Sequence, residues 1–123
     1  MNASQRNVLI AALLSLLLGA FAPLDVFGGG EAVVKHGETL FNGNCSKCHG
    51  LKGAGTDKGP PLVHKIYEPN HHADISFHWA AERGVRAHHW GFGDMPPVQG
   101  VSKDEVSAII KYIRGLQKEA GIF

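Results

Sequence analysis

The sequence predicts a small all-α domain in which three to four helices are joined by long loops. Three segments carry apolar residues at spacings of three and four, as helices that bury one face require. Two stretches between them, residues 50–69 and 85–100, are rich in glycine and proline and predict irregular loops. No segment alternates as a strand does, and the 123 residues are enough for one domain only.

The N-terminus has the pattern of a signal peptide. Arg6 precedes an apolar stretch, residues 8–22, which ends in the small residues Ala20 and Ala22. These fifteen residues are short for a membrane span, which needs about 20. We therefore expect residues 1–22 to be a signal peptide, cut there or as late as about residue 30. Left uncut, the segment would be an N-terminal anchor. Either outcome exports the domain, expected at residues 31–120, to the periplasm.

The first two helices are bounded by recognisable signals. The first is expected at residues 31–42, with Val33, Val34 and Gly37 among its inward positions and Gly43 as its stop. A second, shorter helix is expected at residues 74–83, with Asp74 as its N-cap. Gly84 stands just past its end.

The last helix, within residues 102–121, has the clearest pattern in the chain. Ser102 and Glu105 form a capping box, and Gly121 provides a stop. Its apolar stripe consists of Val106, Ile109, Ile110, Ile113 and Leu116.

The charge of the chain is nearly balanced. Lys and Arg number 12 against 11 Asp and Glu, a net charge of +1. Nucleic-acid-binding domains usually carry a strong basic excess, so no nucleic-acid partner is expected.

The stretch CSKCH holds the only two cysteines, Cys45 and Cys48, followed by His49. A disulfide would close a tiny ring with little stabilising value and leave His49 without a role. A redox-active dithiol belongs in an alternating strand and helix pattern, which is absent. A zinc finger needs a histidine three to five residues beyond His64, but His71 follows only after six.

Haem attachment uses all three residues at once. Two thiols three positions apart lie on one helical turn, so each can add to a vinyl group of the same porphyrin. The imidazole of His49 then follows as an axial ligand of the iron. Export favours this interpretation, because free thiols outside the cytoplasm tend to be oxidised. We therefore expect one covalent haem c on Cys45 and Cys48.

Met95 is the methionine candidate for a second axial ligand, because Met1 lies in the leader. Pro96 and Pro97 restrict the backbone beside it, and a thioether ligand raises the reduction potential of haem iron. No nucleophile or acid–base pair is discernible. The expected function is a single-electron carrier and not an enzyme. The alternatives are a haem protein whose Met95 leaves the iron, acting as an enzyme or ligand sensor, and a histidine-rich copper- or zinc-binding protein.

The chain resembles the class I monohaem c-type cytochromes over residues 31–120. The resemblance rests on GETLF leading into CSKCH, on GPPL, on GDMPPV and on VSAIIKYIRGL. It implies helices and loops wrapped around one haem, and redox proteins as donor and acceptor, such as an oxidase, reductase or dehydrogenase. A membrane would be a partner only if the leader is uncut.

The resemblance also implies roles for individual residues. The carbonyl of Pro60 would contact the far nitrogen of the His49 imidazole, which orients the ring. Leu62 would pack on the porphyrin. Gly37 and Phe41 would meet the last helix at Ile109, Tyr112 and Ile113.

The chain has eight histidines, a high number for its length. A secondary metal site is one candidate role, because imidazoles suit copper and zinc. The alternative is that these are ordinary surface and loop histidines, with one or two hydrogen-bonded near the haem. Adjacent histidines in an extended segment point to opposite sides, so at most one of each pair is expected in a shared site. His88 or His89 in place of Met95 would give bis-histidine ligation. The candidates for the secondary site are His64, His71, His72, His78, His88 and His89.

Two further features leave alternatives open. Trp90 packs either on the domain core or against the haem. Four lysines of the first loop either ring the haem edge and attract an acidic partner, or form an ordinary solvated surface. They are Lys47, Lys52, Lys58 and Lys65.

Overall fold

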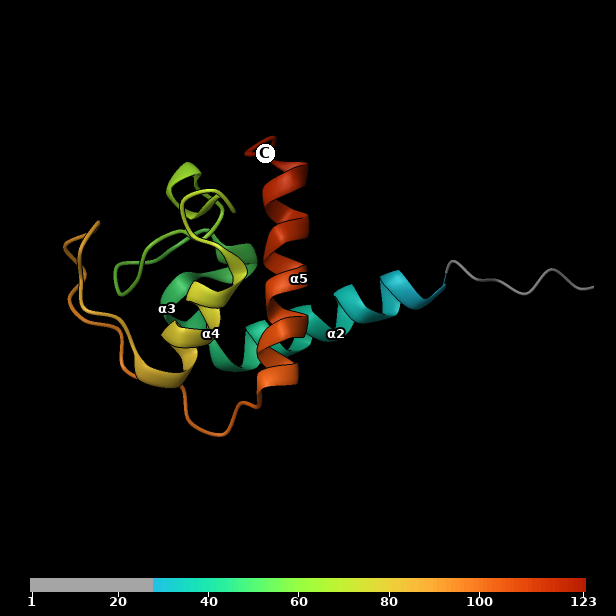
Figure 1. Ribbon diagram of the computed structural model, residues 1–123, viewed down its shortest axis with the longest axis horizontal. Helices are drawn as coiled ribbons and strands as arrows, with labels where there is room; N and C mark the ends of the chain where they lie inside the picture. Colours follow the sequence, from blue (N-terminus) through green and yellow to red (C-terminus); the bar gives the residue numbers. More distant parts are fainter. Residues whose placement is uncertain (1–27) are drawn as a thin grey trace, which may run out of the picture.

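The computed structural model describes residues 28–123, so the predicted leader at residues 1–22 lies outside the described residues. The described chain is helical (Figure 1), which confirms the predicted all-α fold. Its helices are α2 (Gly28–Asn44), α3 (Ser46–His49), α4 (Asp74–Arg83) and α5 (Lys103–Glu119), with short 3₁₀ turns at Leu51–Gly53 and Lys65–Tyr67. Within residues 28–123 no strand forms, and one isolated bridge joins Val85 to Met95.

The core lies where α2 and α5 cross, as Figure 1 shows. Gly37 stands at the crossing, since a Cβ atom there would overlap the carbonyl oxygen of Ala108 and lie 3.0 Å from Tyr112 Cβ. The ring of Phe41 packs at 5.7 Å from that of Tyr112. Phe41, Tyr112, Ile109 and Ile113 form one buried cluster, so the predicted helix contact is confirmed.

The start of α5 has the predicted capping box. The Ser102 hydroxyl accepts from the Glu105 N–H at 3.3 Å, while the Glu105 carboxylate accepts from the Ser102 N–H at 2.8 Å. The end follows the prediction too, because Gly121 has a φ of +68° just after the last turn.

Two predicted helix boundaries were wrong. Gly43 does not stop α2, because helical hydrogen bonding continues through it and the Cys45 N–H still donates to the Phe41 carbonyl at 2.8 Å. The glycine that stops this stretch is Gly50, with a φ of +73°. Asp74 is the first residue of α4 and not its N-cap, which is Ala73.

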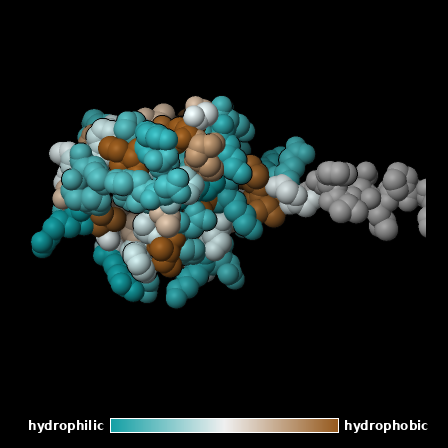
Figure 2. All heavy atoms as spheres, turned by 45° about the horizontal axis from the view of Figure 1, so that its top comes forward, coloured by the Kyte–Doolittle hydropathy of each residue, from teal (hydrophilic) through white to brown (hydrophobic). Residues whose placement is uncertain are grey.

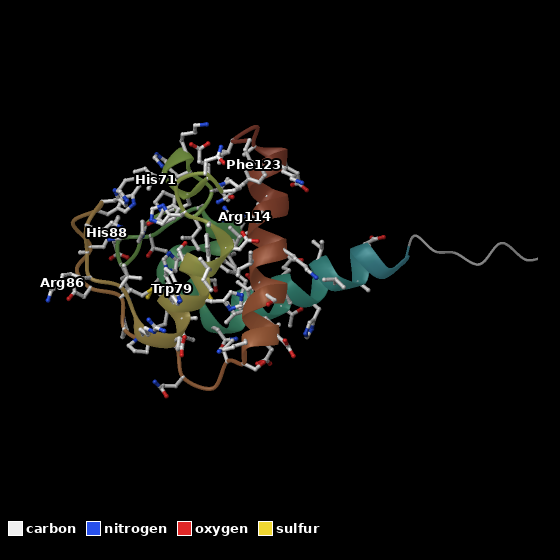
Figure 3. The ribbon with its side chains drawn as sticks, viewed as in Figure 1. His71, Trp79, Arg86, His88, Arg114 and Phe123 are labelled. Atoms are coloured by element: carbon white, nitrogen blue, oxygen red, sulfur yellow. The ribbon has the colours of Figure 1, made fainter. Side chains whose placement is uncertain are left out.

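Two buried polar side chains of α5, Arg114 and Gln117, hold the first loop in place. Arg114 donates to the carbonyls of Tyr67 and His72 at 2.6 and 2.5 Å. Gln117 donates to the carbonyls of Leu62 and Tyr67 at 2.8 and 3.1 Å. Figure 3 shows Arg114 on the side of α5 that faces this loop. The sequence does not mark either residue as buried, because a charged and an amide side chain interrupt the apolar stripe.

Arg114 also anchors the start of α4. Its Nε donates to the Asp74 carboxylate at 2.8 Å, and its guanidinium carbon lies 4.9 Å from the centre of the Phe77 ring. The Asp74 carboxylate is therefore engaged by α5 instead of capping its own helix.

The exposed surface is mixed in character. On the face drawn in Figure 2, hydrophobic side chains form separate patches among hydrophilic ones. No helix within residues 28–123 combines the length and the apolar character needed to cross a membrane.

Candidate haem-binding site

The CSKCH stretch forms one tight turn at the end of α2. The N–H groups of Cys48 and His49 both donate to the Cys45 carbonyl, at 3.2 and 3.0 Å. Cys45 is half-buried, Cys48 is exposed, and neither sulfur is in a disulfide. The turn therefore presents two thiols and an imidazole within five consecutive residues.

The thiol of Cys45 is held in its protonated form at neutral pH. Burial, with a smaller contribution from nearby Cys48, raises its pKa to about 11. Redox-active dithiols carry a cysteine with a lowered pKa. The environment therefore disfavours the dithiol interpretation.

His49 is held in one orientation by the predicted contact with Pro60. Its Nδ1 lies 2.9 Å from the Pro60 carbonyl oxygen, which can only accept, so Nδ1 carries the proton. Burial lowers the pKa of His49, and the Pro60 hydrogen bond opposes this in part. The ring is therefore a neutral imidazole with a free lone pair on Nε2, the form that ligates a metal.

The first loop wraps closely around this turn and so places Pro60. The Thr56 hydroxyl donates to the Cys48 carbonyl at 2.6 Å, and the Gly55 N–H donates to the His49 carbonyl at 2.6 Å. Gly59 lies against Cys48, where a Cβ atom would be 2.9 Å from the Cys48 carbonyl oxygen. A larger residue at position 59 would push the Pro60 segment away.

A cavity of about 480 Å³ opens beside His49. Its wall includes Cys45, His49 and Leu62 from the first half of the domain, and Met95 from the second loop. Apolar side chains make up most of the wall, and the volume falls within the range of about 300–1,000 Å³ that cofactor sites occupy. The structure thus brings the predicted residues Cys45, His49, Pro60, Leu62 and Met95 to one cavity.

Met95 is presented by a loop that is fastened to the end of α4. Val85 and Met95 exchange two backbone hydrogen bonds, of 2.9 and 2.8 Å. The Val98 N–H donates to the Ala81 carbonyl at 2.8 Å. Gly84 has a φ of +77° and a ψ of −177°, and a Cβ atom there would overlap the Met95 carbonyl oxygen. Glycine at position 84 therefore allows the close approach that fixes Met95.

Trp90 lies in the cavity wall, which decides between the two roles that the sequence left open. Within residues 28–123 its Nε1 is the one buried side-chain polar atom without a hydrogen-bond partner. An unpaired buried N–H indicates a ligand with acceptor oxygens, and the carboxylates of a haem meet that requirement.

The donor set and the cavity fit a haem. The Cys45 thiol, an oriented neutral imidazole and a thioether line one apolar space, and the Trp90 indole lies in the same wall. Cys48 is exposed on the same turn as Cys45 and does not line this space.

The chain belongs to the cytochrome c family. The family model described as Cytochrome c matches residues 34–117, which include the CSKCH turn, Met95 and most of α5. Membership implies a covalent haem c and a haem-based role in electron transfer. Neither the search of curated proteins nor the search of solved structures found a match.

The six histidines considered for a secondary site separate into two groups. His64 and His78 are engaged elsewhere, His64 with the Ile66 N–H at 3.2 Å and His78 near the Ser107 hydroxyl at 3.5 Å. The other four, His71, His72, His88 and His89, lie close together. Both members of the pair His71 and His72 place a ring nitrogen near one of His89. The expectation of one histidine per pair was wrong, because residues 71–72 lie in a turn and not in an extended segment.

Proposed function

We propose that the protein is a periplasmic single-electron carrier with one haem c. Cys45 and Cys48 would hold the haem through thioether bonds formed by addition of each thiol to a vinyl group. His49 and Met95 would be its axial ligands. Haem supplies an iron that cycles between Fe(II) and Fe(III). The observation that carries the proposal is the neutral His49 imidazole, fixed by Pro60 and facing the cavity that Met95 also lines.

Each side chain has a definite role in this proposal. Pro60 keeps the proton on Nδ1 of His49 and so leaves Nε2 for the metal. Met95 contributes a soft sulfur, which favours the reduced state and raises the reduction potential. Leu62 contributes apolar surface to the cavity wall, which keeps water from that part of the site.

Export to the periplasm is supported by the signal-peptide pattern of residues 1–22. The electron donor and acceptor would be an oxidase, a reductase or a dehydrogenase with an acidic docking face. Four exposed lysines of the CSKCH turn and the first loop support an acidic docking face on the partner, because opposite charges attract. Electron transfer to such a partner should slow as salt is added. These lysines are Lys47, Lys52, Lys58 and Lys65.

The ligand assignment is tested with Met95→Ala in the exported protein. Haem should remain covalently bound while the reduction potential falls, because the identity of the axial ligand strongly determines that potential. Gln99→Ala, at an exposed position of the same loop, should leave the potential unchanged. An unchanged potential in Met95→Ala would show that another residue is the ligand.

Covalent attachment is tested with Cys45→Ser and Cys48→Ser combined. Acidified solvent should then extract the haem, whereas haem in the unaltered protein should stay with the polypeptide. Rapid binding of carbon monoxide by the reduced, unaltered protein would contradict the simple carrier. It would favour a haem protein with a displaceable Met95.

A further inference from the structure

Four imidazoles from two separate segments meet at the edge of the haem cavity, and three of them, His72, His88 and His89, are part of its wall. His71 and His72 lie in the turn before α4, and His88 and His89 lie in the loop after it. The ring centres of His71 and His89 are 5.1 Å apart, those of His72 and His89 are 5.2 Å apart, and those of His88 and His89 are 4.3 Å apart. Figure 3 shows the labelled His71 and His88 reaching toward the same region from these two segments.

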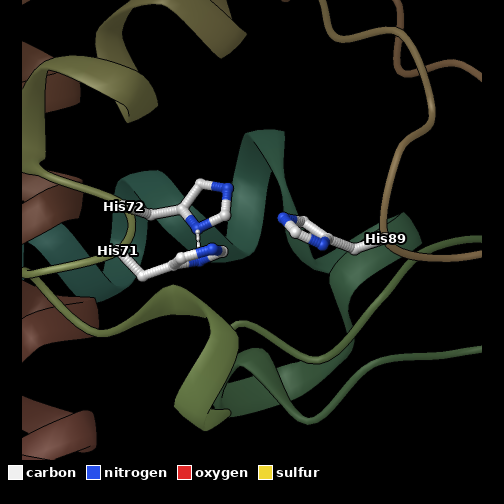
Figure 4. Close-up of side chains that lie close together, drawn as sticks. All are labelled: His71, His72 and His89. Carbon is white, nitrogen blue, oxygen red and sulfur yellow. Dashed lines mark hydrogen bonds between the residues drawn. The ribbon is translucent and has the colours of Figure 1, made fainter.

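Three of these rings place one ring nitrogen each within a small volume. The nitrogens of His71, His72 and His89 all lie within 4.8 Å of one another. In Figure 4, His71 and His72 extend from one backbone segment and His89 faces them from the other. His88 lies outside this group, with its ring stacked on His72 at 5.9 Å.

The hydrogen bonds of His71 and His72 fix which nitrogen is free. Both Nδ1 atoms point at the carbonyl oxygen of Ile66, at 2.8 and 2.7 Å. The oxygen has two lone pairs and can accept from both rings. The two Nδ1 atoms also lie within hydrogen-bond distance of each other, at 3.0 Å, as the dashed line in Figure 4 marks. Nε2 of each ring then carries a lone pair. Metal-binding histidines typically donate their other N–H to a backbone carbonyl in this way.

The turn that carries these two histidines is itself held in place. The N–H groups of His71 and His72 donate to the Glu68 carbonyl at 3.1 and 2.8 Å. Arg114 of α5 donates to the His72 carbonyl at 2.5 Å. Two of the three rings are therefore positioned by the core before any ligand arrives, which reduces the ordering cost of binding.

No carboxylate offsets the charge that these rings would carry if protonated. Within residues 28–123 no ion pair involves any of the four histidines. Burial lowers the pKa of His72, and nearby His71, His88 and Arg114 lower it further, against an opposing hydrogen bond from Ile66. The pKa of His89 is also lowered, first by desolvation and then by the neighbouring histidines. The close packing of these rings therefore disfavours a positive charge on any one of them.

We propose that His71, His72 and His89 form a binding site for one divalent first-row transition-metal ion, separate from the haem iron. Neutral imidazole suits Cu²⁺ and Zn²⁺ among the ions of this class. Metal–nitrogen distances of about 2.0–2.1 Å place two tetrahedral ligands about 3.3 Å apart. The rings must therefore close by up to about 1.5 Å from their present separation of at most 4.8 Å. His89 is exposed on its loop, so its ring can move toward the other two without disturbing the core.

The site is tested on the holoprotein, purified without a histidine tag and stripped of metal with a chelator. Titration with Zn²⁺, and separately with Cu²⁺, should show one ion bound per chain. His89→Ala and His72→Ala should each weaken binding about tenfold or more, because even indirect partners of metal ligands have effects of that size. His36→Ala, an exposed histidine on α2, should bind as the unaltered protein does. Cu²⁺ electron paramagnetic resonance should report nitrogen ligands that are lost in His89→Ala.

Two outcomes would overturn the site. One is the absence of stoichiometric binding by the unaltered holoprotein. The other is equal affinity in His89→Ala and in the unaltered protein. His89→Ala is the safer variant for folding, since the residue is exposed, and an unchanged visible spectrum would verify that the haem environment is intact. A coloured protein that binds no metal refutes this site alone, whereas a colourless protein refutes the proposed electron carrier.

Discussion

Replacing Gly37 with alanine tests whether the crossing of α2 and α5 depends on the absence of a side chain. The added Cβ would overlap the Ala108 carbonyl oxygen and lie 2.9 Å from the carbonyl carbon and 3.0 Å from Tyr112 Cβ. Favourable separations between carbon atoms are about 3.5–4.0 Å. The helices must therefore separate by about 0.5–1 Å at their closest point. The neighbouring atoms are mostly backbone, so they cannot move aside by changing a rotamer.

The expected loss follows from two opposing effects. Overpacking of a tight core costs about 1–3 kcal/mol, and the rigid α5 backbone favours the upper part of that range. Alanine in place of glycine within a helix regains about 1 kcal/mol. The net change in the free energy of unfolding is a loss of about 1–2 kcal/mol. Phe41 and Ile113, which are fully buried at 0% exposure, would lose contacts in the process.

Urea unfolding of the holoprotein, followed by circular dichroism, measures this change. The matched control is Gly115→Ala within α5, where nothing lies within 4 Å of the added Cβ. That variant should gain about 0.5–1 kcal/mol from helix propensity alone. The same substitution should thus have opposite signs at the two positions. A Gly37→Ala protein as stable as the unaltered one would refute the tight crossing.

Three further substitutions test the loops and the cap. Gly84→Ala places a side chain in a backbone region that is essentially restricted to glycine, which costs about 1–3 kcal/mol. It should also release the Met95 loop, seen as faster proteolysis of residues 85–98. Arg114→Met leaves the His72 carbonyl without its donor and should lower the free energy of unfolding by about 2 kcal/mol or more. Ser102→Ala removes the cap of α5 and should cost about 1 kcal/mol, measured by urea unfolding.

Each of these has a result that would count against it. Unaltered proteolysis of Gly84→Ala would mean that the Val85–Met95 bridge is not what fixes the loop. For Arg114→Met, the comparison is Lys111→Met at an exposed position of the same helix, and equal stabilities would argue against the buried network. A Ser102→Ala protein with undiminished stability would show that the Glu105 carboxylate alone suffices as a cap.

The site was more predictable from sequence than its surroundings. Cys45, Cys48 and His49 are neighbours in the chain, so one helical turn is enough to bring them together. The start of α5 was predictable for the same reason, since Ser102 and Glu105 interact within one turn. The end of α2 was not. Gly43 has the residue type of a helix stop, but a stop needs a positive φ, and that conformation occurs at Gly50.

Residues that act through distant partners could not be recognised in this way. Arg114 and Gln117 interrupt the apolar stripe of α5, and only the fold shows that they are buried against the carbonyls of Leu62, Tyr67 and His72. The position of Trp90 in the cavity wall depends on how the second loop, which contains it, packs against the rest of the domain. No local pattern in the sequence marks the contacts of Arg114 and Gln117, because their partners lie 42–55 residues away.

The sequence by itself determined the helical class, the pair of thiols with their histidine, and the methionine available to face it. These depend on spacings within one or two turns, where the geometry of the helix fixes which side chains share a face. Only the tertiary structure decided that Trp90 lies in the cavity wall, that Gly84 lies against Met95, and that two histidine pairs converge. Those contacts arise when α5 and the loops pack on α2. Packing depends on the volumes and hydrogen bonds of residues far apart in the chain, which no short segment contains.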